Sequence, residues 1–251
     1  MLQKNCAAGK TAHACASPNG RCAFLSWAGA RGLPLAICDR MASAWRMNSY
    51  RKGDILFYQG NNPLSLYFLC EGAIKLVRAD RAGRQHILRV IASSDFLGER
   101  ALLAEQSYAA SAEVMEDSQI CALDAQKFRE FWRTDPDLPR LFARYLALKL
   151  ADADAASCDL ALCTISEMLA KIILRRSGEA CGGIFTFFES RQELADILGT
   201  SPEVVSRTLA EFRGKKLLKI EGRRVKIIND ARLRAVARLP PDGHDLHQGL
   251  G

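Results

Sequence analysis

The sequence lacks the segments that a membrane protein or an exported protein needs. No uninterrupted apolar run among the 251 residues reaches the roughly 20 residues that a membrane-spanning helix requires. Lys4, Lys10, His13 and Arg21 interrupt the N-terminal region, which therefore lacks the apolar core of a signal peptide. These absences lead us to expect a cytoplasmic protein with no membrane partner.

Enzyme motifs are also missing. The sequence has no glycine-rich phosphate loop, zinc signature or nucleophile motif, so we do not expect an enzyme. Histidine is scarce, and two of the four histidines, His244 and His247, lie in a polar tail. Haem is therefore the least supported cofactor. Cysteine is abundant, and nine cysteines without an export signal favour metal or redox chemistry over disulfides.

Composition indicates a globular protein with a polyanionic partner. Hydrophobic residues make up 49% of the chain and charged residues 25%, as in ordinary folded domains. The net charge of +7 favours a partner such as a nucleic acid. The length suffices for two domains.

Two helices joined by a short turn are predicted near the C-terminus. Ser190 and Glu193 have the spacing of a capping box, and Gly199 suits the residue after the end of that helix. Ser201 followed by Pro202 then begins a second helix, because proline is tolerated at the first helical position. The runs Leu217–Ile220 and Arg224–Ile228 follow and flank a short turn, which predicts a hairpin. This order is typical of a winged helix-turn-helix.

The second helix has one buried and one exposed face. Val205, Leu209 and Phe212 form the apolar stripe. The opposite face carries Glu203, Ser206 and Arg207, whose side chains suit the cytosine amino group, the thymine methyl group and guanine, respectively. Eight Lys/Arg against four Asp/Glu between residues 201 and 230 make this region basic. Expected phosphate contacts are Ser190, Arg191, Ser201, Lys215, Lys216, Arg223 and Arg224.

The region from about Tyr50 to Phe128 predicts an antiparallel roll. Short apolar runs are separated by glycines, which favours a barrel or jelly roll. The expected strands are Ile55–Tyr58, Leu66–Leu69, Ala73–Val77, His86–Ile91, Ala112–Met115 and Ile120–Leu123.

A long helix is expected from about Asp137 to Ala156, and another from about Ile165 to Arg176. The long helix carries a coiled-coil-like seam that could pair with a second copy of the chain. Its members are Leu141, Tyr145, Leu148, Asp152 and Ala155.

The chain resembles the Crp/Fnr superfamily of bacterial transcription regulators, in its Fnr-like branch. Four stretches between Lys52 and Arg207 support this: KGDILFYQG (Lys52–Gly60), SLYFLCEGAIKL (Ser65–Leu76), DFLGE (Asp95–Glu99) and EVVSR (Glu203–Arg207). The resemblance implies an α+β fold with a cyclic-nucleotide-binding-type β-roll, a dimerisation helix and a C-terminal winged helix-turn-helix. It also implies a homodimer that binds palindromic TTGAT-type half-sites through Glu203, Ser206 and Arg207 and acts with RNA polymerase.

The resemblance also bears on the signal sensed. Gly98-Glu99 matches the cyclic-AMP-binding pattern, but Tyr108-Ala109-Ala110 stands where that pattern has an arginine triplet. Without the arginine, burial of the cyclic phosphate would be uncompensated, so we do not expect cyclic AMP binding. Gly98, Glu99 and Tyr108 remain the candidate residues of an effector pocket.

Oxygen-sensing Fnr proteins hold a [4Fe-4S] cluster on three N-terminal cysteines and one cysteine in the roll. Ser118–Leu123 matches the strand pattern of the roll cysteine and singles out Cys121. Cys6, Cys15 and Cys22, spaced more widely than zinc ligands usually are, would complete the four thiolates. The alternatives are a small organic ligand in the roll, thiol oxidation, for which Cys158 and Cys163 are a candidate pair, and no effector.

The expected organisation has five parts: a cysteine-bearing arm (1–40), the β-roll (41–135), the dimerisation helix (136–162), the winged helix-turn-helix (163–238) and a disordered tail (239–251). Cys38 is expected to be a buried hydrophobic side chain. The alternative function is a cyclic-nucleotide-type regulatory module that does not bind DNA. Such a module would not require the exposed Glu203–Arg207 face.

Overall fold

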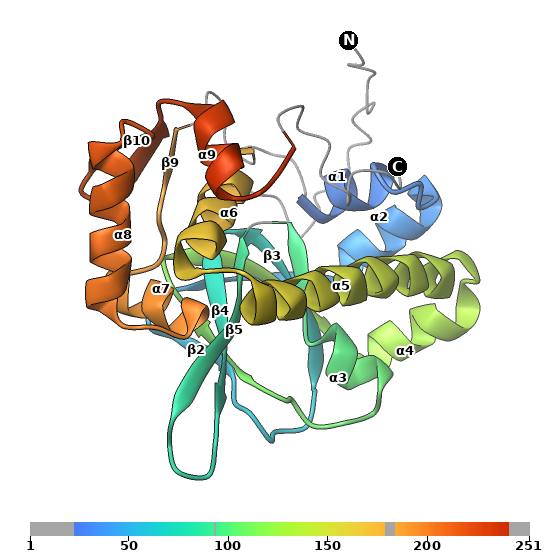
Figure 1. The fold of residues 1–251 in the computed structure, drawn as a ribbon. Helices are drawn as coiled ribbons and strands as arrows, with labels where there is room; N and C mark the ends of the chain where they lie inside the picture. The colour runs from blue at the N-terminus through green and yellow to red at the C-terminus, as the bar shows by residue number, and fades with distance from the viewer. Residues whose placement is uncertain (1–22, 93, 179–183, 241–251) are drawn as a thin grey trace. The chain divides into compact units, whose positions relative to one another are not determined.

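A computed structural model describes residues 23–92, 94–178 and 184–240 (Figure 1). The described chain forms two compact units. One comprises residues up to 76 together with residues 90–144, and the other comprises residues 77–89 together with residues from 145 onwards. No described helix is long and apolar enough to cross a membrane.

The first part of the chain alternates helices with short strands. Its elements are α1 (Ala23–Gly29), α2 (Leu35–Ala44), β1 (Arg46–Tyr50), β2 (Ile55–Phe57), β3 (Ser65–Glu71), β4 (Ala73–Ala79), β5 (Gln85–Ala92), β6 (Asp95–Leu97), α3 (Glu99–Leu103), β7 (Ser111–Val114), β8 (Ser118–Asp124) and α4 (Ala125–Thr134). The second part is mostly helical. Its elements are α5 (Asp137–Leu162), α6 (Ile165–Gly178), β9 (Ile184–Thr186), α7 (Arg191–Leu198), α8 (Pro202–Gly214), β10 (Leu218–Glu221), β11 (Arg224–Ile227) and α9 (Asp230–Val236).

Two four-stranded sheets form the roll, which confirms the predicted jelly roll. Their strand orders are β1-β8-β3-β6 and β2-β7-β4-β5. Inward-facing side chains of both sheets form one apolar cluster, to which Phe57, Leu69, Ile74 and Ile120 belong. Because successive residues of a strand point to opposite faces, Phe68 and Cys121 face outward beside the inward Leu69 and Ile120. The six strands expected from the sequence are present, whereas β1 and β6 were not expected.

The turn between β3 and β4 depends on a glycine. Gly72 has a φ of 104°, in the region that favours glycine. A Cβ at this position would also overlap the side chain of Ser118. The close approach of the turn to β8 therefore requires a residue without a side chain.

The expected cysteine-bearing arm (1–40) contains two helices in its described part. Residues from Ala23 onwards form α1 and α2, which the sequence analysis missed. The ring of Phe24 in α1 lies 5.7 Å from that of Phe68 in β3, and the ring of Trp27 lies 4.8 Å from that of Phe96 in β6. Burial of these large aromatic side chains explains why α1 folds onto the outer face of the sheet. Cys38 in α2 is fully buried, as predicted.

The long helix α5 extends to Leu162, six residues beyond the expected end. Leu138 and Phe142, near its start, are buried against the aromatic side chains of the first unit. Beyond residue 145 the helix has exposed large apolar side chains, namely Leu148, Leu150, Leu160 and Leu162.

Helices α6 to α9 and a small sheet form the C-terminal fold. The predicted hairpin is present as β10 and β11, and β9, which the sequence analysis missed, pairs with the other side of β11. A single apolar cluster joins the helices to the sheet, with Leu169, Leu194, Val205, Phe212 and Val225 among its fully or nearly fully buried members.

Candidate DNA-binding and sensing sites

The helix-turn-helix begins at the predicted capping box. Glu193 N–H donates to Ser190 Oγ at 3.2 Å, and Ser190 N–H donates to Glu193 Oε2 at 2.8 Å. Gly199 ends α7 in the left-handed conformation, with a φ of 64°. Pro202 occupies the first turn of α8, as expected. Local sequence signals thus fix both ends of the turn between the two helices.

Helix α8 buries one face and exposes the other. Val205, Leu209 and Phe212 are almost completely buried, whereas Glu203, Ser206 and Arg207 are exposed. The core therefore fixes the rotation of the helix about its axis. The three side chains predicted to contact bases lie together on its free face.

The carboxylate of Glu203 on this face remains suited to base edges. A hydrogen bond from Ser201 lowers the pKa of Glu203, which favours the ionised carboxylate. An ionised carboxylate only accepts hydrogen bonds, as recognition of a cytosine amino group requires.

Basic side chains are exposed after the end of α8 and at the turn that follows β10. Lys215, Lys216, Arg223 and Arg224 are exposed, and the latter two lie at the turn between β10 and β11. Arg191, at the start of α7, is partly buried, with its guanidinium 5.9 Å from the centre of the Phe187 ring. Burial, followed by the positive charge of Arg223, lowers the pKa of Arg191. A phosphate group would relieve this repulsion between two guanidinium groups.

A buried ion pair connects α6 to the segment that precedes α7. Arg176 Nη2 lies 2.8 Å from Glu189 Oε1, and the Glu189 side chain is only 1% exposed. Glu189 is adjacent to Ser190, the N-cap of α7. The pair therefore fixes the point at which the helix-turn-helix begins, and the sequence analysis did not identify it.

The predicted effector residues converge, but a side chain fills the space between them. Tyr108 is buried and stacks on Phe57, with ring centres 3.8 Å apart. A Cβ on Gly98 would lie 3.3 Å from the Tyr108 ring, and Glu99 is also buried. Burial, followed by the neighbouring Tyr67, raises the pKa of Tyr108, so the phenol stays protonated. The side chain at the arginine position of cyclic-AMP-binding proteins is thus a neutral, packed aromatic group.

An open depression of about 360 Å³ lies beside β1 and the start of β8. Its lining consists of Ser49, Tyr50, Arg51, Glu71, Asp117, Ser118 and Gln119.

The roll cysteine lies beside a second cysteine that the sequence analysis did not single out. Cys121 is fully buried in β8, and its Sγ lies 3.3 Å from the Sγ of Cys70 in β3. Cys6, Cys15 and Cys22 lie outside the described residues. Within the described ranges, no three His, Cys, Asp or Glu side chains gather as a metal site.

The predicted dimer seam is divided between buried and accessible positions. Leu141 and Tyr145 are buried within the chain itself. Leu148 and Asp152 are exposed, and Ala155 is intermediate. Among the seam positions, the accessible ones therefore begin after Tyr145.

Two known domain families match separate parts of the chain. Residues 47–135 match the cyclic nucleotide-binding domain, and residues 167–236 match the Crp-like helix-turn-helix domain. The chain belongs to the Crp/Fnr family of transcription regulators. It is therefore a DNA-binding regulator rather than an enzyme.

The relatives of this chain include a cyclic AMP receptor protein and an Anr-type transcriptional activator. It is 28% identical over 206 residues to the cyclic AMP receptor protein of Thermus thermophilus, covering 82% of this chain and 94% of that protein. It is 27% identical over 192 residues to the transcriptional activator Anr of Pseudomonas protegens, covering 74% and 78%. The comparison supports the Crp/Fnr family as a whole, and the assignment to the Fnr-like branch stays a prediction.

A solved structure has the same fold. The structure of FixK2 from Bradyrhizobium japonicum superposes with a TM-score of 0.71 at 24% identity, covering 76% of this chain and 96% of that one. The α+β architecture predicted from the sequence is thereby confirmed.

Proposed function

We propose that this protein is a homodimeric regulator that recognises palindromic TTGAT-like half-sites and acts with RNA polymerase. The observation that carries the proposal is the exposed face of α8. One side of this helix is buried in the core, and the other side exposes Glu203, Ser206 and Arg207. An arginine and a glutamate on such a helix match guanine and cytosine edges in the major groove.

Sequence-specific binding is tested by the affinity for two duplexes at one salt concentration. Fluorescence anisotropy compares a TTGAT palindrome with a duplex of the same composition in scrambled order. We expect the palindrome to bind at least about 10³-fold more tightly, the lower end for specific complexes. Equal affinities would contradict the proposed recognition and favour a binding module without sequence-specific DNA recognition.

The second copy would pair along the accessible part of α5. Leu148, Leu150, Leu160 and Leu162 leave apolar surface exposed there, and a partner helix could cover it. Two recognition helices related by a two-fold axis would then meet half-sites about one helical turn apart.

Asp152 provides a test of this pairing. It is exposed among the apolar residues of α5, where like charges from two copies would repel each other. Asp152→Ala should therefore strengthen dimerisation, measured by sedimentation. An unchanged monomer fraction would contradict its place in the seam.

For the sensor, we propose a [4Fe-4S] cluster on Cys6, Cys15, Cys22 and Cys121. Cys121 opposes Phe68 in the strand pairing, so its side chain lies on the outer face of the sheet, where Phe24 of α1 packs. When bound, the cluster supplies an iron centre that responds to oxygen or nitric oxide.

The packing around Tyr108 supports a signal other than cyclic AMP. The neutral ring occupies the space beside Gly98 and offers no positive charge to a cyclic phosphate. A small organic ligand of the roll is the second candidate signal.

An anaerobic absorption spectrum with iron and sulfide analysis separates the two signals. We expect a broad band near ~400 nm and about four irons per chain, both lost in Cys121→Ala and in air. Cys38→Ala is the matched control, because Cys38 is equally buried but lies in α2. A colourless, iron-free wild type that still binds the palindrome would contradict the cluster and leave the organic ligand.

A further inference from the structure

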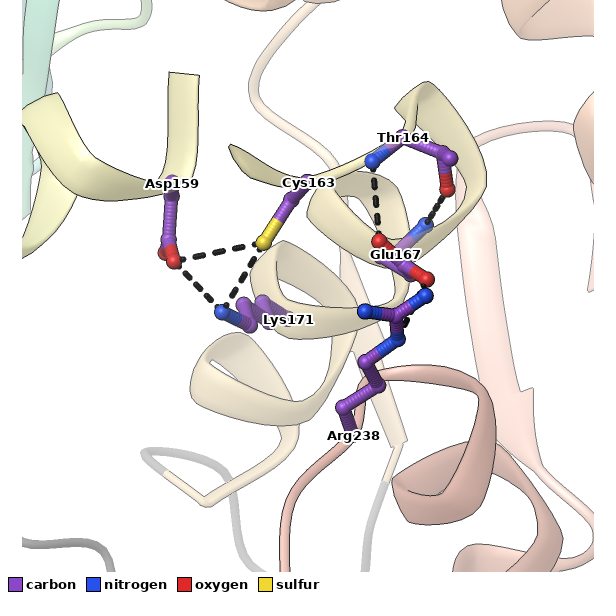
Figure 2. Close-up of polar contacts among 6 residues, drawn as sticks. All are labelled: Asp159, Cys163, Thr164, Glu167, Lys171 and Arg238. Atoms are coloured by element: carbon purple, nitrogen blue, oxygen red, sulfur yellow. Dashed lines mark hydrogen bonds and ion pairs between the residues drawn. The ribbon is translucent and has the colours of Figure 1, made fainter. Parts of the chain in front are cut away.

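The side chains of Asp159, Cys163 and Lys171 contact one another at the connection between α5 and α6 (Figure 2). Lys171 Nζ donates a hydrogen bond to Asp159 Oδ1 and lies 3.4 Å from the sulfur of Cys163. The same sulfur lies 3.5 Å from Asp159 Oδ1. The three groups come from the last turn of α5, the connection between the helices and the second turn of α6.

The connection that holds Cys163 is fixed from its other side. Thr164 N–H donates to Glu167 Oε2 at 2.9 Å, and Glu167 N–H donates to Thr164 Oγ1 at 3.3 Å, which closes a capping box on α6. Arg238 Nε lies 2.7 Å from Glu167 Oε1 and ties the chain after α9 to the same cap (Figure 2). The sulfur is therefore held in place beside Lys171 rather than free to swing into solvent.

The sulfur of Cys163 lies between a carboxylate that can accept the thiol proton and an ammonium group that can donate one. An ammonium group beside sulfur stabilises the thiolate, which is the nucleophilic form of cysteine. Burial opposes the charge on Lys171, but the hydrogen bonds and charges of Asp159 and Cys163 together outweigh burial and raise the pKa of Lys171, so the ammonium persists at neutral pH. Cys163 is also only partly buried.

We propose that Cys163 is a modification site at which hydroperoxides oxidise the thiol to a sulfenic acid. The sulfur attacks one peroxide oxygen, forming an S–O bond as the O–O bond breaks. The thiol proton passes to the Asp159 carboxylate, and the leaving oxygen is protonated by the Lys171 ammonium. Solvent restores both groups, so thiol and hydroperoxide give sulfenic acid and water or an alcohol. Sulfur loses two electrons and the peroxide gains them.

The oxidation disturbs the contact between the two helices. The added oxygen must occupy space beside a sulfur that already contacts both Lys171 and Asp159. The ion pair between them therefore separates, and the tie between the end of α5 and α6 is lost. A regulator with this site would register peroxide at the junction that leads into its DNA-binding helices.

Cys158 provides an internal control. It lies one and a half turns earlier on α5 and is more exposed than Cys163, yet it has no hydrogen bond or ion pair in the described part of the chain. Exposure alone predicts that Cys158 reacts faster. Activation by Lys171 predicts the opposite order.

The test treats the reduced full-length protein with hydrogen peroxide and traps sulfenic acid with dimedone. The two cysteines share one tryptic peptide, between Lys149 and Lys171, so fragment-ion sequencing separates them. We expect Cys163 to be trapped at least about threefold faster than Cys158. Equal or faster trapping at Cys158 would overturn the proposal.

A matched variant tests the role assigned to the lysine. Lys171→Met keeps most of the side-chain volume and removes the charge, so trapping at Cys163 should fall about threefold while trapping at Cys158 stays unchanged. A melting curve checks that the variant is folded. Undiminished trapping at Cys163 in the folded variant would contradict activation by Lys171.

Amide hydrogen exchange tests the loss of the helix contact. Oxidation of the wild type should speed exchange over residues 164–171, whereas the same treatment of Cys163→Ser should not. Unchanged exchange in a sample whose Cys163 is oxidised would refute this consequence.

Discussion

The buried ion pair between Arg176 and Glu189 is predicted to stabilise the attachment of α7 to α6, and substitution of Arg176 tests this prediction. Arg176→Met removes the cation and keeps an apolar side chain of similar length. The side chain of Glu189 is 1% exposed and that of Arg176 is 14% exposed. The carboxylate would therefore remain buried without its cation.

The expected cost is large because an uncompensated buried charge is expensive. Breaking a buried pair by removing one partner costs about 3–5 kcal/mol. Since Arg176 retains some exposure, we expect about 3 kcal/mol for Arg176→Met. In Arg176→Met/Glu189→Leu, both charges are replaced by apolar groups, and at least about half of the loss should be recovered.

Urea unfolding followed by circular dichroism measures these changes. Arg213→Met is the control, because Arg213 is an exposed residue near the end of α8 and should change stability by less than about 0.5 kcal/mol. If Arg176→Met also changes the free energy of unfolding by less than about 0.5 kcal/mol, the pair does not hold the start of α7.

Three further outcomes can be measured on the same protein. Ser190→Ala removes one half of the capping box and should cost about 1 kcal/mol in urea unfolding; no change would mean that solvent caps α7 equally well. Gly72→Ala forces a side chain against Ser118 at a φ of 104° and should destabilise the roll by more than about 2 kcal/mol. A hydrogen bond from the Thr164 backbone lowers the pKa of Glu167 below its usual 4.5. Its contribution to stability should therefore be complete above that pH and disappear as the pH falls through the lowered value. Glu167→Gln should lose this part of the acid dependence, and an unaltered pH profile would contradict the assignment.

Local sequence signals predicted the helix-turn-helix because each signal acts on neighbouring residues. The capping box, the left-handed Gly199 and Pro202 at the start of α8 all work within one turn of helix. The periodicity of Val205, Leu209 and Phe212 then fixed which face is exposed. These features need no knowledge of the rest of the fold.

The missed features depend on partners far away in the sequence. Residues 23–44 are rich in small side chains and carry weak periodicity, and α1 is held by Phe24 against Phe68, 44 residues later. Similarly, Cys70 lies next to Cys121 only because a strand register brings β3 beside β8. The sequence analysis assigned Leu141 and Tyr145 to a seam with a second chain, whereas both are buried within this chain. A heptad pattern shows which side chains need burial but not which chain covers them.

The central claim, base recognition by the exposed face of α8, is tested most directly with Arg207→Ala on a set of half-site variants. Each position of a TTGAT palindrome is substituted in turn, and binding is measured for the wild type, for Arg207→Ala and for Arg213→Ala as a control on the same helix. We predict that Arg207→Ala loses about 1–3 kcal/mol, and that the loss disappears when the guanine position is already substituted. A uniform weakening across all sequences, or an equal loss in Arg213→Ala, would contradict base recognition by Arg207.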